Sequence, residues 1–346
     1  MAENIITSLN YLHGTPQSSA LLRSEMADFK VYEILPFTPC GEGEHLLIYL
    51  RKTGANTTFV AKALAKYFRV KEALVSYAGL KDRFAITEQW FGVHLPGKQN
   101  FDLSDVNIDG VEILHYQRHH KKLRIGALLG NRFQLVLRNV SHRDDIEKRW
   151  QKIQQTGVPN YFGEQRFGIN GGNLPKALAL FAGKKVRDKK KRGLYLSAAR
   201  SYLFNHIVNA RIEQQCFAQL LTGDVCMLAG TQSVFKVPEV TAELAQRLQN
   251  FDIDITAPMW GAGKLMSTDN ALALEQSIAE QHEEICAGLV DFGLKQERRK
   301  IRLNITQGKL AINKNSVTLD FFLPAGCYAT TVLRELVNYQ DMTERA

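Results

Sequence analysis

The sequence predicts an α+β fold of two domains. Patterns typical of strands occupy the N-terminal third and return near the C-terminus, whereas the middle of the chain is mostly helical in pattern. A chain of 346 residues also exceeds the size at which single cores usually stop growing. We therefore expect the first domain to be completed by the C-terminal segment and the helical middle to be an insertion.

The N-terminal third contains the clearest strand patterns. Residues 31–34 (VYEI) and 45–50 (HLLIYL) are rich in Val, Ile, Leu and Tyr, and a turn-like PFTPCGEGE stretch lies between them. Residues 89–95 (QWFGVHL) and 132–140 (RFQLVLRNV) alternate apolar and polar side chains, which is typical of strands with one buried face.

A helix is predicted after the second strand, over residues 57–68. Asn56, Thr57 or Thr58 can cap its N-terminus. Its apolar residues recur at helical spacing and form one stripe, which we interpret as core: Phe59, Val60, Ala63, Leu64, Tyr67 and Phe68.

The amino-acid composition changes at residues 157–173, which are rich in Gly, Asn and Pro. We interpret this segment as a candidate domain boundary. A helix is predicted just before it, at 143–155. The segment up to about residue 300 is mostly helical in pattern, and the last part of the chain predicts a strand, a turn (PAG) and a helix through Tyr339. The remaining predicted elements are helices at 197–214, 243–249 and 271–289 and a strand at 317–323.

Composition places the chain among ordinary globular proteins, with 45% hydrophobic and 23% charged residues. No apolar run of 18 residues could span a bilayer, and the N-terminus lacks the basic and apolar regions of a secretory signal, so we expect a cytoplasmic protein without membrane contact. Five cysteines without a CxxC pair argue against a disulfide framework or a structural zinc site.

The net charge of +9 is concentrated in three basic runs: residues 118–124 (RHHKKLR), 184–192 (KKVRDKKKR) and 295–302 (KQERRKIR). Any one of them could be a solvated face. Three together favour a polyanionic partner, because phosphate contacts supply most of the sequence-independent affinity for nucleic acids.

Asp82 lies between two cations in GLKDRF, ahead of a predicted strand. The stretch could be a surface turn, or it could hold an anion for chemistry, because cations close to a carboxylate favour its ionised form. No phosphate loop, dinucleotide-binding glycine motif, HExxH or GxSxG motif is present. What remains is a reaction that an aspartate can perform without a metal or a nucleotide cofactor.

Five segments, in this order, give the chain a recognisable resemblance: YAGLKDRFAITEQW (77–90), KKLRIGALLGNRFQLVLR (121–138), GVPNYFGEQRFG (157–168), LSAARSYLFN (196–205) and LPAGCYATTVLREL (323–336). Together they resemble the tRNA pseudouridine synthase D (TruD) family, from about Phe29 to the C-terminal helix. The resemblance implies an isomerase that converts one uridine of tRNA, number 13, to pseudouridine without a cofactor or a metal.

The same resemblance places Asp82 at the position of the family's catalytic aspartate. The carboxylate could attack the anomeric carbon as a nucleophile or act as a base toward the ribose, and the sequence leaves both routes open. In extended backbone Lys81 and Arg83 would point away from Asp82, so we expect its ion-pair partner to come from elsewhere. The resemblance suggests Arg23, which matches a basic position in the N-terminal strand region of the family.

For the substrate, the resemblance implies contacts from Phe29, Asn131 and Tyr328. An extruded base is commonly held between aromatic faces and read along its polar edge. Without the resemblance, Phe29 and Tyr328 would be interpreted as core and Asn131 as a turn residue. Family members often carry Phe in place of Tyr328.

The resemblance further implies a mixed, largely antiparallel sheet with flanking helices, built from residues 1–156 and 304–346, and an inserted domain at 157–303. An alternative function is a tRNA-binding or chaperone protein that keeps the scaffold without catalysis. The intact GLKD stretch around Asp82 favours the enzyme. A metal-dependent nuclease would need a ligand cluster that the sequence does not show.

Overall fold

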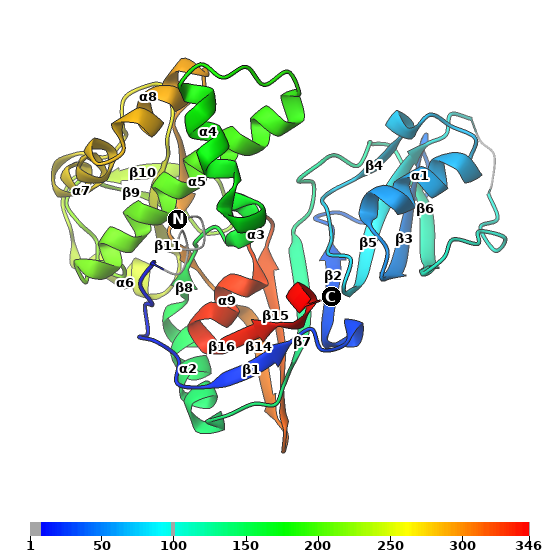
Figure 1. Ribbon diagram of the computed structural model, residues 1–346, viewed down its shortest axis with the longest axis horizontal. Coiled ribbons are helices and arrows are strands. Elements are labelled where there is room, and N and C mark those ends of the chain that lie inside the picture. The colour runs from blue at the N-terminus through cyan, green and yellow to red at the C-terminus, as the bar shows by residue number, and fades with distance from the viewer. Residues whose placement is uncertain (1–7, 98–100, 346) are drawn as a thin grey trace. The chain divides into compact units, whose positions relative to one another are not determined.

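A large mixed sheet organises one of the two units of the chain (Figure 1). The computed structural model describes residues 8–97 and 101–345. We call residues 16–150, 305–329 and 336–346 the sheet unit, and residues 1–15, 151–304 and 330–335 the helical unit.

The strands of the sheet unit follow the order β14-β15-β7-β2-β5-β3-β6, with β1 paired to β16 and β7, and β4 paired to β5. The β2–β5 and β1–β16 pairs are parallel and the other pairs are antiparallel, so the predicted mixed, largely antiparallel sheet is confirmed. The bounds are β1 (Ser19–Leu22), β2 (Phe29–Ile34), β3 (His45–Thr53), β4 (Val75–Tyr77), β5 (Ile86–His94), β6 (Val111–His119), β7 (Gly130–Arg138), β14 (Thr306–Ile312), β15 (Ser316–Pro324) and β16 (Asn338–Asp341).

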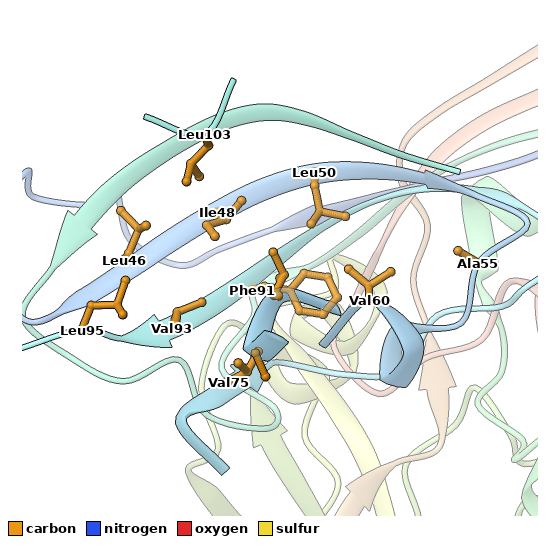
Figure 2. Close-up of a cluster of buried hydrophobic side chains, with 12 residues drawn as sticks. Leu46, Ile48, Leu50, Ala55, Val60, Val75, Phe91, Val93, Leu95 and Leu103 are labelled. Carbon is orange, nitrogen blue, oxygen red and sulfur yellow. The ribbon is translucent and has the colours of Figure 1, made fainter. Parts of the chain in front are cut away.

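Helix α1 (Thr57–Tyr67) covers part of this sheet and closes a hydrophobic core. Figure 2 shows the side chains of this core, among them Leu46, Ile48 and Leu50 of β3, Val60 of α1 and Phe91 of β5. The apolar stripe is narrower than the sequence predicts, because Phe59 and Tyr67 stay 48% and 38% exposed. Burial thus follows the central residues of the stripe, whereas its edges face solvent.

The helical unit combines helices with a second, smaller sheet. Its strands β10-β9-β11-β12 form one sheet and β13 pairs with β8, while α2 and α9 contribute residues to both units. The bounds are α2 (Arg143–Thr156), α3 (Glu164–Phe167), α4 (Asn173–Phe181), α5 (Lys189–Glu213), α6 (Ala242–Gln249), α7 (Asp269–Glu280), α8 (Glu283–Asp291), α9 (Ala329–Leu336), β8 (Val158–Pro159), β9 (Asp224–Leu228), β10 (Val234–Val237), β11 (Ile253–Met259), β12 (Glu297–Lys300) and β13 (Arg302–Leu303).

Helices α4, α5 and α8 pack together around one core of the helical unit (Figure 1). Ala177 of α4, Leu203 of α5 and Leu289 of α8 are each almost completely buried there. No helix within residues 8–97 and 101–345 is both long and apolar enough to cross a membrane.

Three parts of the observed fold differ from the sequence predictions. The predicted helix at 271–289 is two helices, because His282 leaves helical geometry between α7 and α8. The predicted C-terminal helix ends at Leu336 rather than Tyr339, and the chain continues as β16, which pairs in parallel with β1. The four-stranded sheet of the helical unit was not predicted, and β12 (ERRK) has no apolar residue by which alternation could reveal it.

Candidate active site

The predicted site residues all belong to the sheet unit, at strand ends or in loops. Asp82 lies in the loop between β4 and β5, and Phe29 is the first residue of β2. Asn131 is the second residue of β7, and Tyr328 lies between β15 and α9. Strand ends and loops carried by a rigid sheet commonly hold functional residues.

Hydrogen bonds join the loop before Asp82, the loop that leads into Asn131 on β7, and the loop after β15 that carries Tyr328. The amide of Gly126 donates to the carbonyl of Ala78 at 2.7 Å, which ties the segment before β7 to the segment before Asp82. The amide of Ala325 donates to the carbonyl of Leu129 at 3.1 Å, which ties the segment after β15 to the same place. The structure therefore brings together three loops that are far apart in the sequence.

Arg23 is the ion-pair partner of Asp82. Its Nη2 lies 2.9 Å from Oδ2 of Asp82, and its Nη1 contacts Oδ2 of Asp341. The Arg23 side chain is only 7% exposed, whereas the Asp82 side chain is 36% exposed. A buried cation thus contacts a carboxylate that is partly exposed to solvent. The expectation that Arg23 pairs with Asp82 is confirmed.

The two cations next to Asp82 in the sequence contact other groups. Lys81 pairs with Glu33 at 2.9 Å, and Nε of Arg83 donates to the carbonyl of Gly54 at 3.2 Å. The fold, rather than proximity in the sequence, therefore brings Arg23 to Asp82.

The ring of Phe29 packs against the guanidinium of Arg23. The guanidinium carbon of Arg23 lies 4.1 Å from the centre of the Phe29 ring, and Phe29 itself is 2% exposed. Its ring also makes an edge-to-face contact with Phe133, with 6.3 Å between ring centres. Such a cation–π contact favours one position of the guanidinium. Arg23 additionally adopts φ 57°, a left-handed conformation that costs a non-glycine residue on the order of 1 kcal/mol.

Lys52 is a buried residue of the site that sequence reasoning missed. Its ammonium donates to the carbonyls of Ala55 at 2.8 Å and Asp82 at 2.9 Å, and the residue is fully buried. Burial lowers the pKa of Lys52 to about 8. The available signal was position: Lys52 follows Leu46, Ile48 and Leu50 on the inward face of β3, where a lysine is unusual.

Asn131 belongs to a second polar group beside Asp82. Nζ of Lys81 donates to Oδ1 of Asn131 at 2.8 Å and lies 2.9 Å from Oε2 of Glu33. Glu33 is directly opposite Asn131 in the β2–β7 register. Tyr328 is half-buried, and Asn131 is likewise partly accessible.

Two of the three basic runs, 295–302 and 184–192, differ in what their side chains contact. In the run 295–302, Arg298 pairs with buried Glu275, and Lys300 and Arg302 both pair with Asp254. Three cations of this run are therefore neutralised by carboxylates inside the helical unit, so the run is not simply a solvated face.

The run 184–192 differs, because its side chains are mostly exposed. Within the described part of the chain no carboxylate forms an ion pair with them. Asp188 accepts from the backbone amides of Lys190 and Lys191 and so caps α5. The cap uses the one acidic side chain of the run and leaves the cationic ones facing outward.

Comparison with known proteins agrees with this fold. A family model described as tRNA pseudouridine synthase D (TruD) matches residues 6–175 and 181–336. The tRNA pseudouridine synthase D of Colwellia psychrerythraea is 63% identical over 345 residues, which cover 97% of this chain and 94% of that protein. That of Aeromonas salmonicida is 50% identical over 337 residues, covering 97% and 96%. A crystal structure from Methanosarcina mazei, assigned to the same family, matches with a TM-score of 0.71 over 94% of this chain and 95% of the other, at 22% identity, and bears on the fold alone.

These matches define the class of protein as a pseudouridine synthase, an isomerase that converts uridine to pseudouridine. The chain belongs to the tRNA pseudouridine synthase D family.

Proposed function

We propose that this protein isomerises a specific uridine of tRNA, uridine 13 by family resemblance, and that Asp82 is its catalytic residue. The observation that carries the proposal is the Arg23–Asp82 ion pair, in which the cation is buried and the carboxylate remains accessible. The segment that carries Asp82 is hydrogen-bonded to the segment before β7 and, through Lys81, to Asn131 itself, and the segment before β7 is bonded in turn to the loop of Tyr328.

The reaction is an isomerisation, so the bonds that break and form all belong to the substrate uridine. The bond from ribose C1′ to N1 of uracil breaks, the base rotates, and a new bond forms from C1′ to C5. The hydrogen of C5 leaves as a proton, and N1 carries a hydrogen in the product. Neither an oxidant nor a group donor is consumed, so side chains alone can supply the chemistry.

Asp82 can act in this reaction in two ways. As a nucleophile it would bind C1′ while the base rotates, as carboxylates do at anomeric carbons in retaining glycosidases. As a base it would remove a proton from the ribose. Both routes require a carboxylate of fixed direction, which the contact with Arg23 and the hydrogen bond from Lys52 to the Asp82 carbonyl support.

The remaining site residues bind the extruded nucleoside in this proposal. Tyr328 offers an aromatic face for the base, and its hydroxyl group does not disturb stacking. Asn131 contacts the polar edge of the base. Phe29 contributes mainly by supporting Arg23, since its ring is buried beneath the guanidinium.

The proposal also assigns the two domains and the segment that binds tRNA. Residues 1–156 and 304–346 form the catalytic domain, and residues 157–303 form the inserted domain. The exposed run 184–192 binds phosphates of tRNA, because cationic side chains without internal partners are available to them. The reaction takes place in the cytoplasm, where tRNA is found, and uses no cofactor or metal.

The test uses unmodified tRNA labelled with tritium at C5 of uracil. Formation of pseudouridine releases that hydrogen, so the wild type is expected to release tritium and Asp82→Asn is expected to release none, while both bind the tRNA. Asp109→Asn, at a surface position of the same unit, is the control and should match the wild type. Equal release by Asp82→Asn would refute the catalytic role, and tRNA binding without release by the wild type would support the non-catalytic alternative.

A further inference from the structure

Lys81, the residue before Asp82, has a role of its own. We propose that it fixes the orientation of the Asn131 amide, so that the NH2 group of Asn131 donates a hydrogen bond to a carbonyl oxygen of the uracil. This inference rests on the proposed function, in which Asn131 faces the base. It adds a positioning residue and the chemical identity of the group that is recognised.

Contacts with Asn131 and Glu33 fix the position of the Lys81 ammonium. Nζ of Lys81 lies 2.8 Å from Oδ1 of Asn131 and 2.9 Å from Oε2 of Glu33. The side chains of Lys81 and Glu33 are 8% and 0% exposed. The backbone amide of Lys81 also donates to Oγ1 of Thr57 at 3.1 Å, which holds the main chain.

Glu33 is fixed in turn by the sheet. Its Oε1 accepts a hydrogen bond from the backbone amide of Trp90 at 3.2 Å, while its Oε2 faces Lys81. Because Glu33 and Asn131 are register partners on β2 and β7, the carboxylate that pairs with the Lys81 ammonium and the amide that accepts its hydrogen bond are held by paired strands. The ammonium thus lies between two groups of fixed position.

The chemistry of an ammonium decides which end of the amide faces it. Oxygen and nitrogen of an asparagine amide are nearly equal in shape, and their assignment follows from the hydrogen-bond partners. An ammonium has three donors and no acceptor, so it can bind only Oδ1. The NH2 group must then point away from Lys81, and no residue within 8–97 and 101–345 accepts a hydrogen bond from it. It is a donor available to a ligand.

Uracil suits such a donor throughout the reaction. Its two carbonyl oxygens, O2 and O4, lie symmetrically about the axis through N3 and C6. Rotation about this axis exchanges N1 with C5 and also exchanges O2 with O4. A fixed donor therefore meets a carbonyl oxygen before and after the rotation, whereas cytosine would present an amino group in one of the two positions.

The experiment compares variants in the tritium-release assay, after wild type and Asp82→Asn have established the activity. Lys81→Met removes the ammonium and keeps the length of the side chain. Asn131→Asp keeps the acceptor for Lys81 and removes the donor. Each is expected to lower kcat/KM at least tenfold, while Lys71→Met, an exposed lysine of the same unit, is expected to match the wild type.

A double-mutant cycle separates positioning from a general structural role. If Lys81 acts through Asn131, then Lys81→Met should lower kcat/KM less than threefold further in an Asn131→Ala background. Fully additive losses would overturn the inference. So would Asn131→Asp with wild-type activity, and this variant still decides the question if Lys81→Met fails to fold, since it keeps the contact with Lys81.

A substrate arm identifies the recognised group independently. Sulfur is a weaker acceptor than oxygen, so tRNA with 2-thiouridine or 4-thiouridine at the target position should react more slowly with the wild type. The Asn131→Asp variant, which lacks the donor, should show a smaller thio effect. An equal thio effect in both proteins would contradict the proposed hydrogen bond while leaving the role of Asp82 untouched.

Discussion

Arg23 binds Asp341 with one terminal nitrogen while the other lies 2.9 Å from Asp82. Asp341 is the last residue of β16, and β16 pairs in parallel with β1, which ends one residue before Arg23. The C-terminal strand thus places a second carboxylate on the cation that contacts Asp82. Asp341 lies beyond residue 336, where the match to the family model ends.

This geometry predicts unequal effects of two substitutions at Arg23. Arg23→Met removes the Arg23 contact from Asp82 and should lower kcat/KM by about 10- to 100-fold, the range for loss of one charged hydrogen bond. Arg23→Lys should recover only part of the loss, because an ammonium cannot reproduce the planar fork that holds two carboxylates. Tritium release measures both. Full activity of Arg23→Lys would show that charge alone suffices.

Asp341 is predicted to contribute by holding Arg23. Asp341→Asn should reduce kcat/KM less than Arg23→Met does, and it should have little effect once Arg23 is already Met. Thr343→Val is the matched control, because Thr343 donates to Asp341 without contacting Arg23. A large effect of Asp341→Asn in the Arg23→Met background would indicate another role for the carboxylate.

Lys52 predicts a specific dependence of stability on pH. In the folded protein its pKa is lowered to about 8, whereas in an unfolded chain it is about 10.4. Below pH 8 Lys52 is protonated in both the folded and the unfolded state, so the folded protein bears the full free-energy cost of burying the charged ammonium. Between these values the unfolded state binds more protons, so the free energy of unfolding should rise with pH, by up to about 3 kcal/mol in total.

The comparison with Lys52→Met isolates this contribution. The difference in free energy of unfolding between wild type and variant should shift toward the wild type as pH rises from 7 to 10, as measured by urea denaturation. Other titrating groups are common to both proteins and cancel in the difference. A difference that is constant over this range would mean that Lys52 titrates alike in both states.

Lys52 and Arg23 also show what sequence can and cannot reveal about such a site. The alternation of β7 and the stripe of α1 are local patterns, and both elements were predicted from them. Resemblance supplied Asp82, Phe29, Asn131 and Tyr328, but their roles stay proposals. Lys52 was visible only as a lysine on the inward side of a strand.

Non-local pairing explains most of the elements that were missed. Strand β16 has four residues and exists because β1, more than 300 positions earlier, pairs with it. Strand β12 consists of charged residues whose partners are distant: Arg298 pairs with Glu275, and Lys300 pairs with Asp254. A basic run is interpreted as exposed unless the opposing acids are known, and only the fold brings these acids near.

The exposed run at the start of α5 is predicted to bind tRNA. Neutralising Lys189, Lys190, Lys191 and Arg192 should weaken tRNA affinity and reduce the dependence of log K on log salt, by about 0.7 to 0.9 for each phosphate that the variant no longer neutralises. Filter binding at several salt concentrations gives both values. Lys236→Gln with Lys264→Gln, exposed positions of the same unit outside the run, should change neither. An unchanged salt slope in the first variant would remove the run from the binding surface.

Tyr328 predicts a contrast between two substitutions that differ in the ring. If the residue stacks on the extruded base, Tyr328→Phe should stay within about twofold of wild-type kcat/KM, because the face of the ring is kept. Tyr328→Ala should lose about 1 to 3 kcal/mol of transition-state stabilisation, or roughly 5- to 150-fold, the range for stacking on one base. Thermal unfolding of each variant separates this loss from a loss of folded protein. Should Tyr328→Phe prove as impaired as Tyr328→Ala, the hydroxyl group rather than the ring would be the part that acts, and stacking would not be its role.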